Sequence, residues 1–155
     1  MASTITAAAL TVTITESIEL NGKDQGGTNT LSIASVNEIS KRIVTVSTTE
    51  ATILTFSAAV GQGTYIAANV RYIRFTNLDN TNFIMLTFKD EGNTEFRVKV
   101  DAGQSFIFNG DNSGGAVDTM KANGSALSSG LADLYDVTAD ADTASCDLEV
   151  FIASV

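Results

Sequence analysis

The acidic side chains near the end of the sequence are the best candidates for a site that carries out chemistry. They are Asp133, Asp136, Asp140, Asp142 and Asp147. In the run DVTADADTASCD, Asp140 and Asp142 alternate, so on an extended chain both carboxylates point to one side, which suits Ca²⁺. The run lacks the glycine at the sixth position and the glutamate at the twelfth that an EF-hand loop requires. A metal site of another kind at Asp140 and Asp142 therefore stands beside the simpler interpretation, an acidic and hydrated loop.

Other catalytic chemistry finds no support in the residue types. The sequence has no histidine, which excludes Ser–His–Asp and Cys–His arrangements and histidine-ligated zinc or iron. The segment GQGTYIAANV lacks the third glycine and the following helix of a dinucleotide loop, and no GxxxxGK[ST] motif occurs. We therefore predict that the chain is not an enzyme, with no catalytic residue and no cofactor apart from the calcium alternative.

Cys146 is the only cysteine, which excludes an internal disulfide and any multi-cysteine zinc site. In SCDLEVFI it shares strand parity with Leu148, Val150 and Ile152. Apolar residues at alternate positions face one side of a strand, so we predict a buried cysteine rather than a reactive thiol.

The net charge of −9 comes from one half of the sequence. Residues 1–78 hold five basic and five acidic groups, whereas residues 79–155 hold four basic and thirteen acidic groups. An acidic surface repels phosphate backbones, so nucleic acid is disfavoured as a partner. No apolar run approaches the roughly 18 residues of a membrane span, and the beginning of the sequence lacks the basic region of a signal peptide. We expect synthesis in a cytoplasm without secretion, and no membrane partner.

Apolar and polar residues alternate along most of the chain, as in LTVTITES, KRIVTVST, ATILTFSA and CDLEVFIAS. Segments rich in Gly, Asn and Asp separate these runs, as turns require. The pattern predicts an all-β fold, an antiparallel β-sandwich or jelly roll of about eight to ten short strands. We expect residues 1–9 to form a flexible arm, whose deletion weakens assembly more than folding, and residues 10–155 to form a single domain.

Gly124–Ala144 departs from this alternation, because it contains few β-forming residues. It is predicted to be a long acidic loop near the C-terminus, with a short helix as an alternative around Leu131–Tyr135.

The stretch from Arg71 to Asp90, RYIRFTNLDNTNFIMLTFKD, is predicted to be a hairpin of two alternating strands. Arg74 and Lys89 fall on the outward faces of these strands, where they could meet an acidic partner surface. The alternative is that both are exposed cations near acidic neighbours such as Asp79 and Asp90.

The segment Val70–Phe108, VRYIRFTNLDNTNFIMLTFKDEGNTEFRVKVDAGQSFIF, resembles a pattern in small virion structural proteins of tailed bacteriophages, especially marine and cyanobacterial phages. In that pattern a strand of the type YIRxTNLD is followed by TNxxxL, by an apolar and basic strand, and by xAGQSF. SIELNGKD is similar to a start of the type SISLNG and RIVTV is similar as well, so the likeness extends over most of the chain from Glu16 onward. Its motifs describe strands and turns and assign no functional residue.

The resemblance implies a capsid decoration, or cement, protein that binds and stabilises the head shell. The implied partners are the major capsid protein and further copies of the chain, as a homo-oligomer and most simply a trimer. The implied location is the capsid surface of the virion, after synthesis in the host cytoplasm. Two alternatives remain: a tail, neck or fibre-associated virion protein, and a carbohydrate- or calcium-binding β-sandwich module.

Overall fold

The computed structural model describes residues 4–61, 63–121 and 130–155. In this part the chain forms β-strands and one short 3₁₀ helix, which confirms the predicted all-β antiparallel sandwich. No helix in the same ranges is long and apolar enough to cross a membrane. The elements are β1 (Ala8–Glu16), β2 (Glu19–Leu20), β3 (Lys23–Asp24), β4 (Gly27–Val36), β5 (Glu38–Val46), β6 (Ala51–Ser57), β7 (Tyr65–Ile66), η1 (Ala67–Asn69), β8 (Val70–Asn77), β9 (Ile84–Asp90), β10 (Glu95–Val100), β11 (Ser105–Asn109), β12 (Leu134–Ala141) and β13 (Cys146–Ser154).

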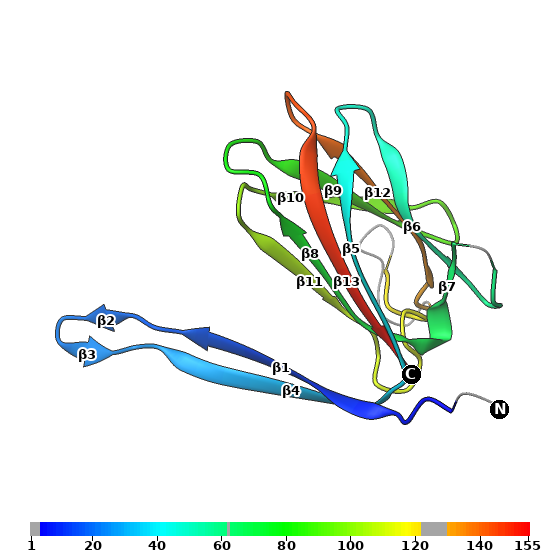
Figure 1. The fold of residues 1–155 in the computed structure, drawn as a ribbon, viewed down its shortest axis with the longest axis horizontal. Coiled ribbons are helices and arrows are strands. Elements are labelled where there is room, and N and C mark those ends of the chain that lie inside the picture. Colours follow the sequence, from blue (N-terminus) through cyan, green and yellow to red (C-terminus); the bar gives the residue numbers. More distant parts are fainter. Residues whose placement is uncertain (1–3, 62, 122–129) are drawn as a thin grey trace.

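Two sheets stack face to face to form the sandwich (Figure 1). The five-stranded sheet has the order β10-β9-β12-β6-β7, with β12 paired to β9 on one side and to β6 on the other. The four-stranded sheet has the order β11-β8-β13-β5 and is antiparallel throughout. The side chains of Cys146, Leu148, Val150 and Ile152 on β13 are all buried, which confirms the predicted parity of this strand.

The core is a layer of apolar side chains between the two sheets, to which β8 contributes Ile73 and Phe75 and β9 contributes Leu86 and Phe88. The rings of Phe75 and Phe88 meet edge to face, with centroids 5.7 Å apart and planes at 88°. Phe96 stacks on Phe88 at 4.9 Å. Aromatic contacts of this kind add to the roughly 1.5–3 kcal/mol that burial of each such side chain contributes.

A long hairpin, residues 8–36, projects from the sandwich (Figure 1, blue to cyan). Strands β1 and β4 pair from Ala8↔Val36 to Glu16↔Gly27, and the short strands β2 and β3 close the tip. The turn at the tip is Asn21–Gly22, with φ of 54° and 76°, the positive values that a two-residue type I′ turn requires. The nine residues of β1 alone span about 30 Å, and the hairpin continues beyond them to its turn.

The predicted N-terminal arm, residues 1–9, falls partly on this hairpin. Residues 1–3 lie outside the described residues, residues 4–7 are exposed and have no regular secondary structure, and β1 begins at Ala8. The flexibility of residues 1–9 and the division into an arm and one domain stay predictions.

The predicted acidic loop near the C-terminus, Gly124–Ala144, is wrong over Leu134–Ala141, whereas residues 130–133 and 142–144 lie outside the strands. Residues 122–129 lie outside the described residues, but Leu134–Ala141 is strand β12, in the middle of the five-stranded sheet. The predicted alternative of a short helix at Leu131–Tyr135 is wrong for the same reason. The core positions of β12 include the small residues Ala139 and Ala141, and a register shift between Leu134 and Asp136 breaks the alternation. Both features weaken the strand signal.

The predicted hairpin from Arg71 to Asp90 is also wrong. Strands β8 and β9 alternate as predicted, but β8 belongs to the four-stranded sheet and β9 to the five-stranded sheet. The connection between them crosses from one layer of the sandwich to the other. Arg74 and Lys89 therefore lie on opposite outer faces of the molecule. Each sheet also contains strands from both halves of the sequence, so the uneven charge along the chain does not become a neutral sheet and an acidic sheet.

Candidate interaction surface

Asp140 and Asp142, the predicted calcium pair, lie at the end of β12. Asp140 is partly buried, and its Oδ1 is enclosed with no hydrogen-bond partner in the described part of the chain. Asp142 is exposed just after the strand, and its backbone N–H donates to the carbonyl of Phe83. Within residues 4–61, 63–121 and 130–155, no three Asp, Glu, Cys or His side chains gather closely enough to hold a metal ion. The calcium alternative stays a prediction.

Lys89 belongs to a polar patch on the outer face of the five-stranded sheet, in register between Glu95 on β10 and Asp136 on β12. Burial raises the pKa of Asp136, with Lys89 opposing this effect. Beside it, Glu50 accepts a hydrogen bond from the hydroxyl of Thr138. This hydrogen bond, aided by nearby cations, lowers the pKa of Glu50 against the opposing effect of burial. Acidic and basic side chains alternate on this patch, so their charges largely cancel.

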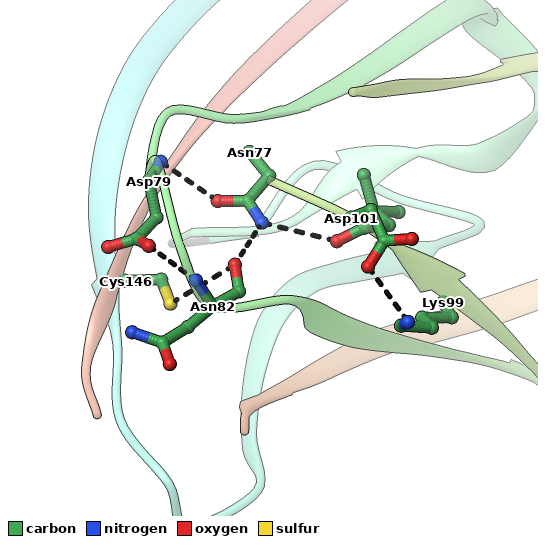
Figure 2. A network of polar contacts seen from close by, with 7 residues as sticks. Asn77, Asp79, Asn82, Lys99, Asp101 and Cys146 are labelled. Carbon is green, nitrogen blue, oxygen red and sulfur yellow. Dashed lines mark hydrogen bonds and ion pairs between the residues drawn. The ribbon is translucent and has the colours of Figure 1, made fainter. Parts of the chain in front are cut away.

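The β8–β9 connection is held by a network around Asn77, which is fully buried (Figure 2). Its amide donates to the carbonyls of Asn82 at 2.9 Å and Val100 at 3.1 Å, and its Oδ1 accepts the backbone N–H of Asp79. Asp79 in turn accepts the backbone N–H groups of Asn82 and Thr81, which lower its pKa. The side chains of the motif TNLDNTN thus form hydrogen bonds within the connection and fix its conformation, so the motif is not an open binding loop.

The thiol of Cys146 lies beside this network (Figure 2). Its Sγ is 3.4 Å from the carbonyl of Ala144, and the side chain is buried. Burial raises the pKa of the thiol. A buried, protonated thiol is a poor nucleophile, in keeping with a packing role.

Arg74 lies on the outer face of the four-stranded sheet, as predicted. Its Nη2 is 2.6 Å from Oε1 of Glu149, and its guanidinium sits 6.0 Å from the centre of the Phe151 ring. Lys41 on β5 reaches the other oxygen of Glu149 at 3.1 Å. Two cations therefore share one carboxylate, which leaves this part of the face with a net positive charge.

The base of the hairpin packs on this outer face. Its inner side, which bears Leu10 and Val12 on β1 and Leu31 and Ile33 on β4, meets an apolar area of the sheet. That area consists of Tyr72, Ile107, Phe151 and Ala153. Burial raises the pKa of the Tyr72 hydroxyl. Between β1 and the sheet runs a groove of about 430 Å³, lined by residues that include Ile14, Arg74 and Phe151.

Beyond Ile14, which still lines the groove beside Arg74, most of the hairpin is open to solvent. Every residue from Thr13 to Thr30 except Gly26 is exposed. The inner side continues with Ile14 and Glu16, whereas the outer side is a ladder of hydroxyl groups in which Thr13 pairs with Thr30 and Thr15 with Thr28. Ile14, Ile18 and Leu20 are 45%, 48% and 56% exposed. Exposed apolar side chains on a thin ribbon mark it as a surface that another chain can cover.

A cavity of about 500 Å³ lies elsewhere, at the end of the five-stranded sheet. Phe56, Leu134 and Tyr135 form its apolar walls, and Glu91 and Asp133 line it as well. Asp133 Oδ1 accepts the backbone N–H of Asp118, which ties this carboxylate to the local structure. The cavity has one half-exposed aromatic ring and two acids, and it is where the carbohydrate alternative would bind.

The sequence predicted that Arg74 faces outward, as it does, but did not predict that the hairpin projects from the sandwich. The signal was present in the Asn21–Gly22 turn and in the alternation of β1 and β4, which predict pairing. Neither feature shows whether the paired strands join a sheet or leave it. The exposed Ile39 and Ile43 on β5 were likewise indistinguishable from core residues, because they alternate as core residues do.

Comparisons with known proteins place few limits on these observations. No family model matches the chain, and no curated protein matches it. A solved structure described as "Bacillus endospore appendages form a novel family of disulfide-linked pili" aligns with a TM-score of 0.42 and 11% sequence identity. The alignment covers 100% of this chain and 95% of that chain.

Proposed function

We propose that the chain is a structural subunit of a tailed-phage virion, a decoration protein that binds and stabilises the head shell together with further copies of itself. The observation that carries the assembly part of this proposal is the projecting hairpin. A two-stranded ribbon exposed on both sides is marginally stable alone, and its apolar side chains gain stability when a neighbouring chain covers them. The hairpin is therefore an element for assembly.

The virion part of the proposal comes from the resemblance of Val70–Phe108 to small phage structural proteins. In the structure this segment comprises β8, β9, β10 and the first residues of β11, with the Asn77 network between them. These residues form the scaffold of the sandwich. In this proposal these residues form the rigid body of the subunit. Attachment takes place at surfaces outside them, such as the hairpin.

Purified virions of the encoding phage provide the test. We expect a cryo-EM map to show the sandwich on the outer surface of the head, with a copy number that follows the capsid lattice. Density confined to the tail or neck would identify a tail, neck or fibre-associated protein instead. Absence of the chain from virions, measured by quantitative mass spectrometry, would overturn the virion proposal altogether.

A further inference from the structure

We propose that the outer half of the hairpin of one copy packs on strand β5 of a second copy, with Glu16 of the first facing Lys41 of the second. This inference rests on the proposed function, because it names the partner of the assembly element. Two triplets of exposed residues carry it, Ile14–Glu16–Ile18 on the hairpin and Ile39–Lys41–Ile43 on β5.

The hairpin triplet has an apolar residue on each side of an anion. Ile14 and Glu16 project from the inner side of β1, the side that packs against the sheet at Leu10 and Val12. Ile18 follows two residues later, with 48% of its surface exposed. No hydrogen bond or ion pair engages the Glu16 side chain within the described chain, so its carboxylate is available to a partner.

The β5 triplet has an apolar residue on each side of a cation, at the same two-residue spacing. Ile39 and Ile43 are each 60% exposed, and the side chain of Lys41 is 59% exposed. Alternate residues of a strand share a face, so all three project from the outer face of the four-stranded sheet. β5 is the edge strand of that sheet. At one end of it Ile39 lines a groove with Ile5 and Ala9 of the same chain, and more than half of the surface of Ile39 and of Ile43 stays exposed.

Lys41 can exchange partners without leaving a charge uncompensated. It shares Glu149 with Arg74, whose guanidinium is closer to that carboxylate, at 2.6 Å against 3.1 Å. If Lys41 turned to an incoming Glu16, Glu149 would keep Arg74. The arrangement therefore supplies one cation that is not needed within the chain, and the hairpin supplies an anion that has no cation of its own.

The intramolecular contact shows how the two surfaces fit. At its base, the inner side of the hairpin already lies on the outer face of this sheet, over Tyr72 and Phe151. The outer half cannot reach β5 of its own chain, because the hairpin runs off past β11, at the opposite edge of the sheet (Figure 1). A second copy offers the same type of face, with the β5 side open. The proposed contact between two copies thus repeats the type of packing that the base of the hairpin makes within one chain, where it lies on the outer face of the four-stranded sheet.

The proposed contact joins two different surfaces, so each copy both gives a hairpin and receives one. Such a contact closes in a reciprocal dimer or in a ring of more copies, and otherwise grows into an open chain. The trimer implied by the resemblance would be a ring of this kind.

A zero-length carbodiimide cross-linker tests the contact directly, because it joins a carboxylate to an amine in contact with it. The full-length protein is mixed as equal parts of ¹⁵N-labelled and unlabelled copies, cross-linked and analysed by mass spectrometry. We expect mixed-isotope peptide pairs that join Glu16 to Lys41. Cross-links between copies that consistently join other residues would overturn the proposal.

Exchanging the charges of Glu16 and Lys41 tests the contact through its effect on the affinity of self-association. We expect Glu16→Lys and Lys41→Glu each to weaken self-association at least roughly tenfold in sedimentation velocity, and the double variant to recover most of the loss. Lys99→Glu is the matched control, since Lys99 is also a half-exposed lysine paired with one carboxylate, Asp101, but on the other sheet. It should leave association unchanged. Glu16→Lys lies on the exposed hairpin, so it decides the test even if Lys41→Glu fails to fold.

The outcomes separate this inference from the proposed function. A wild-type chain that stays monomeric up to about 1 mM but is present on virions overturns the hairpin contact and leaves the decoration proposal standing. A chain that forms the Glu16–Lys41 cross-link but is absent from virions overturns the decoration proposal and supports the contact. No rescue in the double variant would also contradict the proposed pairing.

Discussion

The side-chain amide of Asn77, at the end of β8, donates a hydrogen bond of 3.1 Å to the backbone carbonyl of Val100, at the end of β10. The two strands belong to opposite sheets, so this bond ties the layers of the sandwich together at one end. Asn77 is completely buried, and its amide donates a second hydrogen bond to Asn82. A buried polar group that meets all its partners fixes one arrangement of the loops around it.

Asn77→Asp should therefore be strongly destabilising. The change would place a carboxylate oxygen against the carbonyl oxygens of Asn82 and Val100 and remove the amide donor that both share, at a cost of roughly 2–4 kcal/mol in the free energy of unfolding. Urea unfolding followed by circular dichroism measures this loss. Asn109→Asp, at an exposed position on β11, is the matched control and should change stability by less than about 0.5 kcal/mol. Equal losses in the two variants would contradict the role given to Asn77.

Glu50→Gln should lower stability near neutral pH by about 0.5 kcal/mol, a small value because the side chain is largely solvated. The folded state lowers the pKa of Glu50 below its ordinary value of 4.5, mainly through the hydrogen bond from Thr138. A lowered pKa contributes stability above the ordinary value, and that contribution is lost as the pH falls through the folded value. Melting curves of wild type and Glu50→Gln should therefore converge in acid. A difference that persists below pH 3 would show that Glu50 acts by packing alone.

Asp136→Asn should change stability in the opposite direction to Glu50→Gln. Burial raises the pKa of Asp136 above its ordinary value of 3.8, and its Oδ1 has no hydrogen-bond partner in the described chain. A raised pKa favours the folded state below the ordinary value, and this advantage is lost as the pH rises through the folded value. The neutral amide should therefore raise stability at pH 7 by up to about 1 kcal/mol, or a few degrees in melting temperature, with no gain below pH 3. A loss of stability at pH 7 would mean that attraction to Lys89 outweighs burial.

Replacement of residues 13–30 by an Asn-Gly turn should leave the sandwich as stable as before. The removed residues are exposed except for Gly26, and the apolar contacts at Leu10, Val12 and Leu31 remain. We expect a melting temperature within about 2 °C of the wild type. The same variant should lose self-association in light scattering. A large drop in melting temperature would show that the outer hairpin supports the fold.

Calcium should leave the melting temperature unchanged. Asp140 and Asp142 offer at most two carboxylates, one of them with an enclosed oxygen, whereas Ca²⁺ takes six to eight oxygen ligands. A ligand that binds the folded state raises the melting temperature by mass action. A rise in millimolar calcium that Asp140→Asn abolishes would establish the metal site instead.

The alternation of apolar residues predicted the fold class correctly, because each strand of a sandwich has one face on a single shared core. In β13 the buried set Cys146, Leu148, Val150 and Ile152 follows this rule without interruption. β12 escaped prediction because Leu134 and Val137 are both buried although three residues apart, the result of the register shift between them. Parity rules fail wherever a bulge inserts an extra residue.

Strand partners were harder to predict than strands. Residues 71–90 contain two well-marked strands, but alternation is the same for a strand that turns back on its neighbour and for one that crosses to the opposite sheet. The distinguishing feature is the length and bonding of the connection, which Asn77 and Asp79 organise. For the candidate site, Arg74 was predicted on an outward face, but its neighbours Lys41 and Glu149 come from distant parts of the chain. No local pattern relates them.

The central position of β13 determines the order in which the molecule can fold. β13 is the last strand along the chain, yet it lies between β5 and β8 and pairs with both over most of its length. The four-stranded sheet thus stays divided until residues 146–154 join it, and its closure depends on contacts between residues about a hundred positions apart. Such non-local pairing is slow, whereas the β1–β4 hairpin closes through its own turn. The assembly element is therefore expected to form while the body of the subunit is still incomplete, which exposes its apolar side to other nascent copies before the native surface exists.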